Sequence, residues 1–189
     1  MMKKFTLSAF TLLAMAAPVF AAGSDIEIKN VSVQFIQSPE YTVNPPIHQA
    51  RSEKWMEVEV TFEAKPDFTP ELAFNYYILF AKHLVVGHVN HVNIPKGREL
   101  RSVAYVSPNA IGMLTNGRQF TGADLENVSV TVTSPGVAAP MSMKSFKPST
   151  GEWWASMKQE EGFVVNKSET PFAPLFWDRY VPLKPTSSR

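Results

Sequence analysis

Cysteine is absent from the 189-residue chain. No disulfide can therefore hold the fold, no thiol can act as a nucleophile, and no cysteine can carry the lipid of a lipoprotein. A chain of this length buries an adequate core without such covalent links. We expect a fold held by packing and hydrogen bonds.

Motifs of enzymes are lacking as well. The nine glycines are scattered, and none of them opens a Gly-rich loop before a helix, as phosphate binding requires. The chain has no G-x-S-x-G motif and no S-x-x-K with its partner motifs, so no activated serine is indicated. The sequence predicts a protein that is not an enzyme and carries no cofactor.

The start of the chain, MMKKFTLSAFTLLAMAAPVFAAG, has the three parts of a secretory signal peptide. Lys3 and Lys4 are followed by an apolar run and by a small-x-small site that ends at Ala21. The run is short for a spanning helix, although an uncleaved anchor is the alternative. The short basic start is typical of bacteria, so we expect export to the periplasm, outer envelope or extracellular space, without membrane insertion after cleavage.

An excess of positive charge is also missing. Without residues 1–21, 16 basic residues face 17 acidic ones. This balance gives no electrostatic reason to expect binding to nucleic acid or to an anionic membrane.

Alternating patterns typical of β-strands dominate what is present. In residues 25–37 the alternation slips by one position near Lys29–Asn30, which indicates a β-bulge. Residues 54–64 give the clearest strand, because Met56, Val58, Val60 and Phe62 alternate with Glu57, Glu59, Thr61 and Glu63. After a predicted turn at 65–70, residues 71–82 place Leu72, Phe74, Tyr76, Ile78 and Phe80 on one face.

Further strands are expected at 83–94, 98–107, 127–134 and 161–167. Pro95–Gly97 is predicted to turn the chain, so that 98–107 pairs with 83–94, and 127–134 reads as half-buried. Residues 108–117 suit a short helix that begins at Pro108, and a second short helix is expected around 152–159.

These elements predict an all-β fold, an antiparallel immunoglobulin-like β-sandwich with at most one or two short helices. We place a signal peptide at 1–21, the sandwich at 22–135, and a long C-terminal extension at 136–189 that packs on the same domain.

Histidines and carboxylates do not form a convincing metal or acid–base site. On a strand, His88 and His91 point to opposite faces, and His83 and His91 lie roughly 26 Å apart at about 3.3 Å per residue. Glu57, Glu59 and Glu63 line one face, and we interpret them as a solvated row paired with cross-strand Lys or Arg. No metal is predicted.

Aromatic residues gather near the C-terminus, and four of them are candidates for partner binding: Trp153, Trp154, Trp177 and Tyr180. Exposed tryptophans stack on sugar rings or anchor protein interfaces, and buried ones simply complete a core. Within NKSETPFAPLFWDRY, Pro171 and Pro174 exclude a central strand. We expect this run to lie extended along a sandwich edge with Phe172 and Phe176 buried, while Trp177 and Tyr180 meet a partner.

The leader, the stretch KWMEVEVTFEAKPDFTPELAFNYYILF, a strand ending in AYVSP and the closing TPFAPLFWDRY together resemble one family. It is that of the small secreted immunoglobulin-like proteins encoded beside type IV pilus genes in verrucomicrobial bacteria. The resemblance implies a non-enzymatic envelope protein linked to a pilus-like system, and it brings no catalytic residues.

Two functions follow as hypotheses. The first is an exported structural or interaction protein that binds envelope or pilus-assembly proteins through sheet edges and C-terminal aromatics, with a second copy of the chain as another candidate partner. The second is a glycan-binding module that uses exposed tryptophans.

Overall fold

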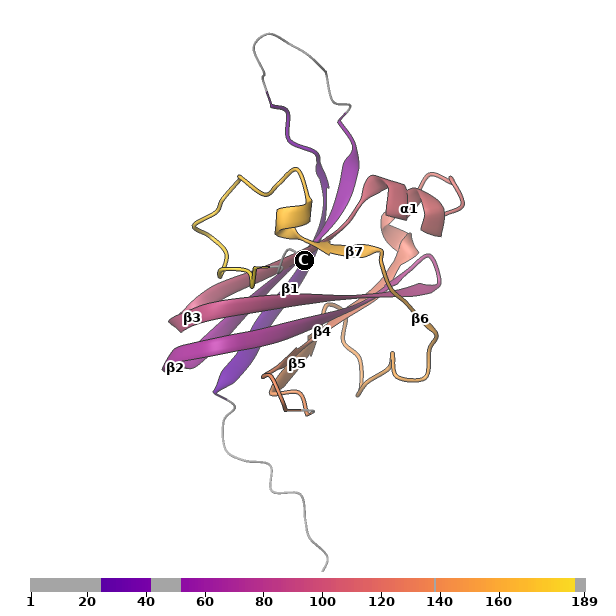
Figure 1. The fold of residues 1–189 in the computed structure, drawn as a ribbon. Helices are drawn as coiled ribbons and strands as arrows, with labels where there is room; N and C mark the ends of the chain where they lie inside the picture. Colours follow the sequence, from indigo (N-terminus) through magenta and orange to yellow (C-terminus); the bar gives the residue numbers. More distant parts are fainter. Residues whose placement is uncertain (1–24, 42–51, 138, 186–189) are drawn as a thin grey trace, which may run out of the picture.

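One long β-hairpin, in which each strand bends midway, forms the centre of the fold (Figure 1). In the computed structural model, which describes residues 25–41, 52–137 and 139–185, strand β2 runs from Lys54 to Phe80 and β3 from His83 to Val106. The two pair antiparallel nearly throughout, with register shifts between Phe62 and Phe68. Both strands of the hairpin bend at this point, so that one half of the hairpin packs on the other half.

The doubled hairpin gives two layers of one continuous sheet. The first layer joins β1, residues 54–64 of β2, residues 97–106 of β3 and β7. The second layer joins β5, β4, residues 71–80 of β2, residues 83–92 of β3 and β6. The added strands are β1 (Ile26–Gln37), β4 (Leu125–Thr133), β5 (Ser142–Ser145), β6 (Gln159–Glu160) and β7 (Val164–Asn166).

The core lies between the layers and is filled by the even-numbered side chains of β2. All nine predicted inward residues are fully buried: Met56, Val58, Val60, Phe62, Leu72, Phe74, Tyr76, Ile78 and Phe80. Phe62 of the first layer and Phe74 of the second have ring centroids 4.9 Å apart. The two halves of one strand thus pack face to face, and the predicted all-β antiparallel fold class is confirmed.

Short helical elements fill the connections. Helix α1 spans Pro108–Leu114, and the Ser107 hydroxyl accepts a hydrogen bond from the Ala110 N–H, so Pro108 starts the helix as predicted. Two 3-10 turns are η1 (Gly122–Asp124) and η2 (Lys167–Glu169). The bulge predicted near Lys29–Asn30 is also present, as a register shift between Ile28 and Asn30.

Two predicted turns are wrong. Residues 65–70 bend β2 without ending it, and neither Pro66 nor Pro70 pairs with a residue of β3, so their missing N–H groups cost no ladder bond. Residues 95–97 likewise bend β3, so 98–107 pairs with the start of β2 and not with 83–94.

Residues 125–160 also depart from expectation. The strand at 127–134 is buried on both faces, with Ser129 and Thr131 at 0% and 2% exposure. The helix expected around 152–159 is absent, since this segment forms turns and then β6, and β5 was not predicted at all.

The described residues of the C-terminal extension cover part of the outer face of each layer. Trp154 packs on Leu84 and Val86 outside the second layer, and Phe172 packs on Val103 and Tyr105 outside the first. The predicted signal peptide at 1–21 lies outside the described residues. Within the described part of the chain, no helix has the length and apolar character needed to span a membrane.

The hairpin tip itself is built from unusual residues. Ala81 and Lys82 form the two-residue turn between Phe80 and His83, and both have positive φ, 50° and 69°. This conformation suits Asn-Gly and is costly for residues with a Cβ. It is held by hydrogen bonds from the Ala81 N–H to the Asp124 carbonyl and from the Lys82 N–H to Glu126.

Lys82→Gly should therefore stabilise the protein by about 1 kcal/mol, because glycine adopts this φ without strain and keeps the N–H that bonds Glu126. Urea denaturation followed by far-UV circular dichroism measures the change. Lys82→Ala is the matched control and should gain little, since it keeps the Cβ. A loss of stability in the glycine variant would contradict this account of the turn.

Candidate functional site

The C-terminal segment, residues 167–181, lies on the outer face of the first layer and presents aromatic side chains to solvent. It is a chain of turns and not the extended run expected from sequence. The contacts of residues 167–181 with the sheet determine how firmly the backbone that carries these aromatics is held.

A single carboxylate, that of Glu59 on β2, is the main polar anchor. Arg179 donates to it from Nε at 3.1 Å and from its terminal nitrogen at 2.9 Å, and the Tyr180 hydroxyl donates at 2.9 Å. Arg101 of β3 completes the cluster at 2.5 Å. Glu59 is 8% exposed, so this part of the predicted solvated row is in fact covered.

The electrostatics of Glu59 match its role as an anchor. Burial raises the pKa of this carboxyl, but hydrogen bonds from Arg179, Tyr180 and Arg101 outweigh burial and lower the pKa below its usual value. Glu59 therefore stays ionised at neutral pH. The neighbouring Glu57 shows the opposite result, because burial raises its pKa despite a hydrogen bond from Tyr105.

An aromatic cluster provides the apolar anchor. The Phe172 ring stacks on Tyr105 at 5.0 Å and meets Trp55 edge-on at 5.7 Å. At the start of the segment, the buried Lys167 donates from its ammonium to the Ala173 carbonyl at 2.9 Å. Phe172 is buried as predicted, and it fixes the middle of the segment on the sheet.

Between these anchors, Phe176 and Trp177 point outward. They are 66% and 79% exposed, and Phe176 has a left-handed φ of 50°. The prediction that Phe176 is buried is wrong, because this left-handed turn breaks the parity of an extended chain. Tyr180 is half-buried and its hydroxyl is used by Glu59.

Trp153 and Trp154 lie elsewhere, on the outer face of the second layer. Trp154 is 3% exposed and stacks on Tyr77 at 4.4 Å, while the half-buried Trp153 donates from Nε1 to the Ser129 hydroxyl at 2.7 Å. The four candidate residues therefore do not form one surface. Of the three C-terminal tryptophans, Trp177 is the one that is exposed.

A serine and a histidine meet inside the core. The Ser102 hydroxyl lies 2.7 Å from His91 Nε2 and 2.7 Å from the Tyr76 hydroxyl, and His91 Nδ1 lies 3.0 Å from the Val181 carbonyl. This contact resembles a nucleophile–base pair, but all three side chains are at most 1% exposed. The group links the two layers and the C-terminal end, and no substrate can reach it.

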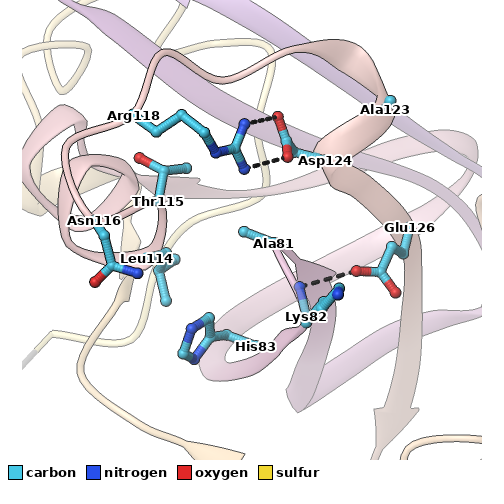
Figure 2. Close-up of a pocket in the computed structure, with 10 residues that line it drawn as sticks. All are labelled: Ala81, Lys82, His83, Leu114, Thr115, Asn116, Arg118, Ala123, Asp124 and Glu126. Carbon is cyan, nitrogen blue, oxygen red and sulfur yellow. Dashed lines mark hydrogen bonds and ion pairs between the residues drawn. The ribbon is translucent and has the colours of Figure 1, made fainter.

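A cleft of about 440 Å³ lies beside the hairpin tip, lined by residues from the tip, the end of α1 and the start of β4 (Figure 2). Figure 2 shows two interactions among its charged residues, an Arg118–Asp124 ion pair and a hydrogen bond from the Lys82 backbone to Glu126. Arg118 binds both carboxylate oxygens of Asp124, at 2.6 and 3.2 Å, and Glu126 accepts from the Lys82 N–H. The cleft thus offers a polar wall without a nucleophile held beside a base.

The histidines of β3 are dispersed, as the alternation predicts. His88 is exposed beside Asn75, His91 is buried, and His83 contacts Glu160. In the part of the chain that the structure describes, no three His, Cys, Asp or Glu residues gather as metal ligands. His48 lies outside the described residues.

The Glu59 cluster was not predicted as a site. The sequence suggested cross-strand partners for the glutamates, and this holds for Arg101 with Glu59, while Glu63 pairs with Lys29 of β1 at 2.9 Å. Nothing local links Glu59 to Arg179, which lies 120 residues later.

Comparisons with known proteins support the fold. A protein-family model matches residues 17–187, nearly the whole chain. A crystal structure of a protein from Akkermansia muciniphila is similar, with a TM-score of 0.71 and 21% sequence identity over 86% of this chain and 94% of that one. A search of curated proteins gives no significant match. At this identity the structural likeness concerns the fold alone.

Glu59→Gln should loosen the C-terminal segment, because it leaves Arg101 and Arg179 facing a neutral amide. We expect a loss of about 1–3 kcal/mol in unfolding free energy. Hydrogen exchange should rise in residues 170–181 and stay low in β2 and β3. Glu63→Gln, which removes an ion pair at the exposed end of the same face, is the matched control. Equal exchange in both variants would show that Glu59 does not hold the segment.

His91 should make stability fall in mild acid. Burial lowers the pKa of His91 from 6.5 to about 4. Between pH 4 and pH 6.5 the His91 ring is therefore protonated in the unfolded chain and neutral in the folded chain. The stability that neutral His91 allows above pH 6.5 is lost as the pH falls. The free energy of unfolding should decrease by about 2 kcal/mol between pH 7 and pH 5.

Unfolding free energies from urea titrations at pH 7, 6 and 5 measure this slope. His91→Asn removes the titrating ring and should flatten it, whereas His88→Asn, at an exposed position on the same strand, should leave it unchanged. An unchanged slope in the first variant would mean that His91 is not the responsible group.

Proposed function

This chain belongs to the family whose model matches residues 17–187, and from that premise we propose that it is a non-enzymatic interaction protein of the bacterial envelope. Its partners are proteins, and it binds them through the exposed aromatics of the C-terminal segment and through sheet edges. In this role the two-layered sheet acts as a rigid support.

The observation that carries this proposal is the outward position of Phe176 and Trp177 on an anchored segment. Anchors lie on both sides of them, Phe172 before and the Arg179–Glu59 pair after. Large aromatics carried by an anchored backbone lose less conformational entropy on binding than those of a free segment, and aromatic residues are enriched at the hot spots of protein interfaces. Two adjacent exposed aromatics are costly in water unless a partner covers them.

The proposal that the protein is not an enzyme has separate support. Ser102 and His91 are sealed in the core, and the cleft near the hairpin tip contains neither of them. In that cleft Arg118 is paired with Asp124, and the Glu126 carboxylate accepts a hydrogen bond from the Lys82 backbone N–H.

Export and pilus association rest on the sequence. The leader at residues 1–21 has the form of a signal peptide, and the resemblance described above is to secreted immunoglobulin-like proteins encoded beside type IV pilus genes. We propose that the two-layered sheet is immunoglobulin-like and serves a pilus-associated or other envelope assembly. The glycan alternative is weaker, since Trp154 and Trp153 are engaged in packing.

Site-specific photo-crosslinking in intact cells tests this function. A photoreactive residue at Trp177 should capture a discrete envelope protein, and the purified pair should then bind with a Kd that rises at least tenfold for Trp177→Ala. Met113, which is 68% exposed on α1, is the matched control position and should capture nothing comparable. Capture of no envelope protein, or equal capture from both positions, would refute the proposed binding surface.

A further inference from the structure

Within the described part of the chain, strand β1 pairs with another strand on one side only, which leaves its other edge without a strand partner. It pairs with β2 from Ile26 to Gln37, and no second strand among residues 25–41, 52–137 and 139–185 pairs with it. Strand β5 approaches β1 near its start, where the Ile28 N–H donates to the Ser142 hydroxyl at 2.9 Å. An unpaired row of backbone N–H and C=O groups is a template for another strand.

The two halves of this edge differ in their protection. Near its start, β1 carries the bulge between Ile28 and Asn30, and Lys29 forms ion pairs with Glu27 at 2.7 Å and Glu63 at 2.9 Å. Bulges and lysines are the usual means by which proteins block edge pairing. The following stretch Val31–Gln37, VSVQFIQ, contains no charge, proline or glycine, so this half is open to pairing.

Burial along this stretch is incomplete. Val33 and Phe35 face the core but are only partly buried, whereas the inward residues of β2 are fully buried. Ile36, on the outer face, is also half-buried and packs beside Trp55. An added strand would cover all three side chains and satisfy the open backbone groups.

We propose that the open edge Val31–Gln37 pairs antiparallel with the same segment of a second copy, about a two-fold axis near Gln34. The stretch is self-complementary in this arrangement, because Val33 then faces Phe35 on one side of the sheet and Ser32 faces Ile36 on the other. The first layers of two copies become one continuous sheet, which is an isologous contact.

The charges beyond the stretch favour the antiparallel direction for a second copy. Lys29 precedes the stretch and Glu40 follows it, so antiparallel pairing brings Lys29, which also contacts Glu27 and Glu63 of its own chain, near Glu40 of the other copy. Parallel pairing would set Lys29 beside Lys29 and Glu40 beside Glu40, which is unfavourable. The proposed function includes binding through sheet edges, and the inference rests on it by naming the β1 edge and a second copy of the chain as its partner. This pairing does not involve Phe176 or Trp177.

The absence of cysteine makes a direct test possible. Sedimentation velocity of the purified protein should show a concentration-dependent dimer. A single cysteine at the exposed Gln34 should oxidise to a covalent dimer at least tenfold faster than one at Met113, which is exposed on α1. If the protein is monomeric at every concentration, or if both cysteines crosslink equally, the proposal is wrong.

Charge reversal at the axis gives a second readout that does not depend on oxidation. Gln34→Lys and Gln34→Glu each place like charges opposite each other and should raise the dimer Kd at least tenfold. Mixing the two variants should restore the dimer. If neither substitution changes the dimer Kd, the two copies associate through another surface and the proposed pairing is wrong. Failure here leaves the Trp177 crosslinking result unaffected, so the two proposals can fail separately.

Discussion

The packing of one strand against itself is the constraint on which the rest of the structure depends. Phe62 and Phe74 both belong to β2, and they meet across the core because the β2–β3 hairpin doubles over between them. A single hairpin thus supplies the centre of both layers. The Tyr76–Ser102–His91 chain of hydrogen bonds then ties the layers together at a point where apolar packing alone would leave polar groups unpaired.

This arrangement leaves two outer faces, and the C-terminal extension covers part of each. Trp154 packs on the second layer and Phe172 on the first, so the described part of the extension is held to the sheet by apolar contacts at two places. The same contacts determine what is exposed. Phe176 and Trp177 project because the residues on either side of them are fixed, which joins the stability of the fold to its proposed binding surface.

The sequence predicted the inward face well, since period-two alternation is a local signal. Every inward residue named for β2 is buried, and the bulge near Lys29 was visible as a phase slip. The bends at 65–70 and 95–97 were misread because proline and glycine mark both turns and bulges. The outer faces were misjudged for a different reason. Alternation cannot reveal that a distant segment covers a polar face, as Arg179 and Tyr180 cover Glu59.

The contact between Glu59 and Arg179 also has a consequence for the order in which the molecule folds. It joins residues 120 positions apart, and contacts of such long sequence separation form only after the entropy of closing the intervening loop has been lost. The β2–β3 hairpin, whose strands are joined by two residues, carries no comparable cost. Phe176 and Trp177 should therefore take their place on the outer face late in folding, after the strands that support them have paired.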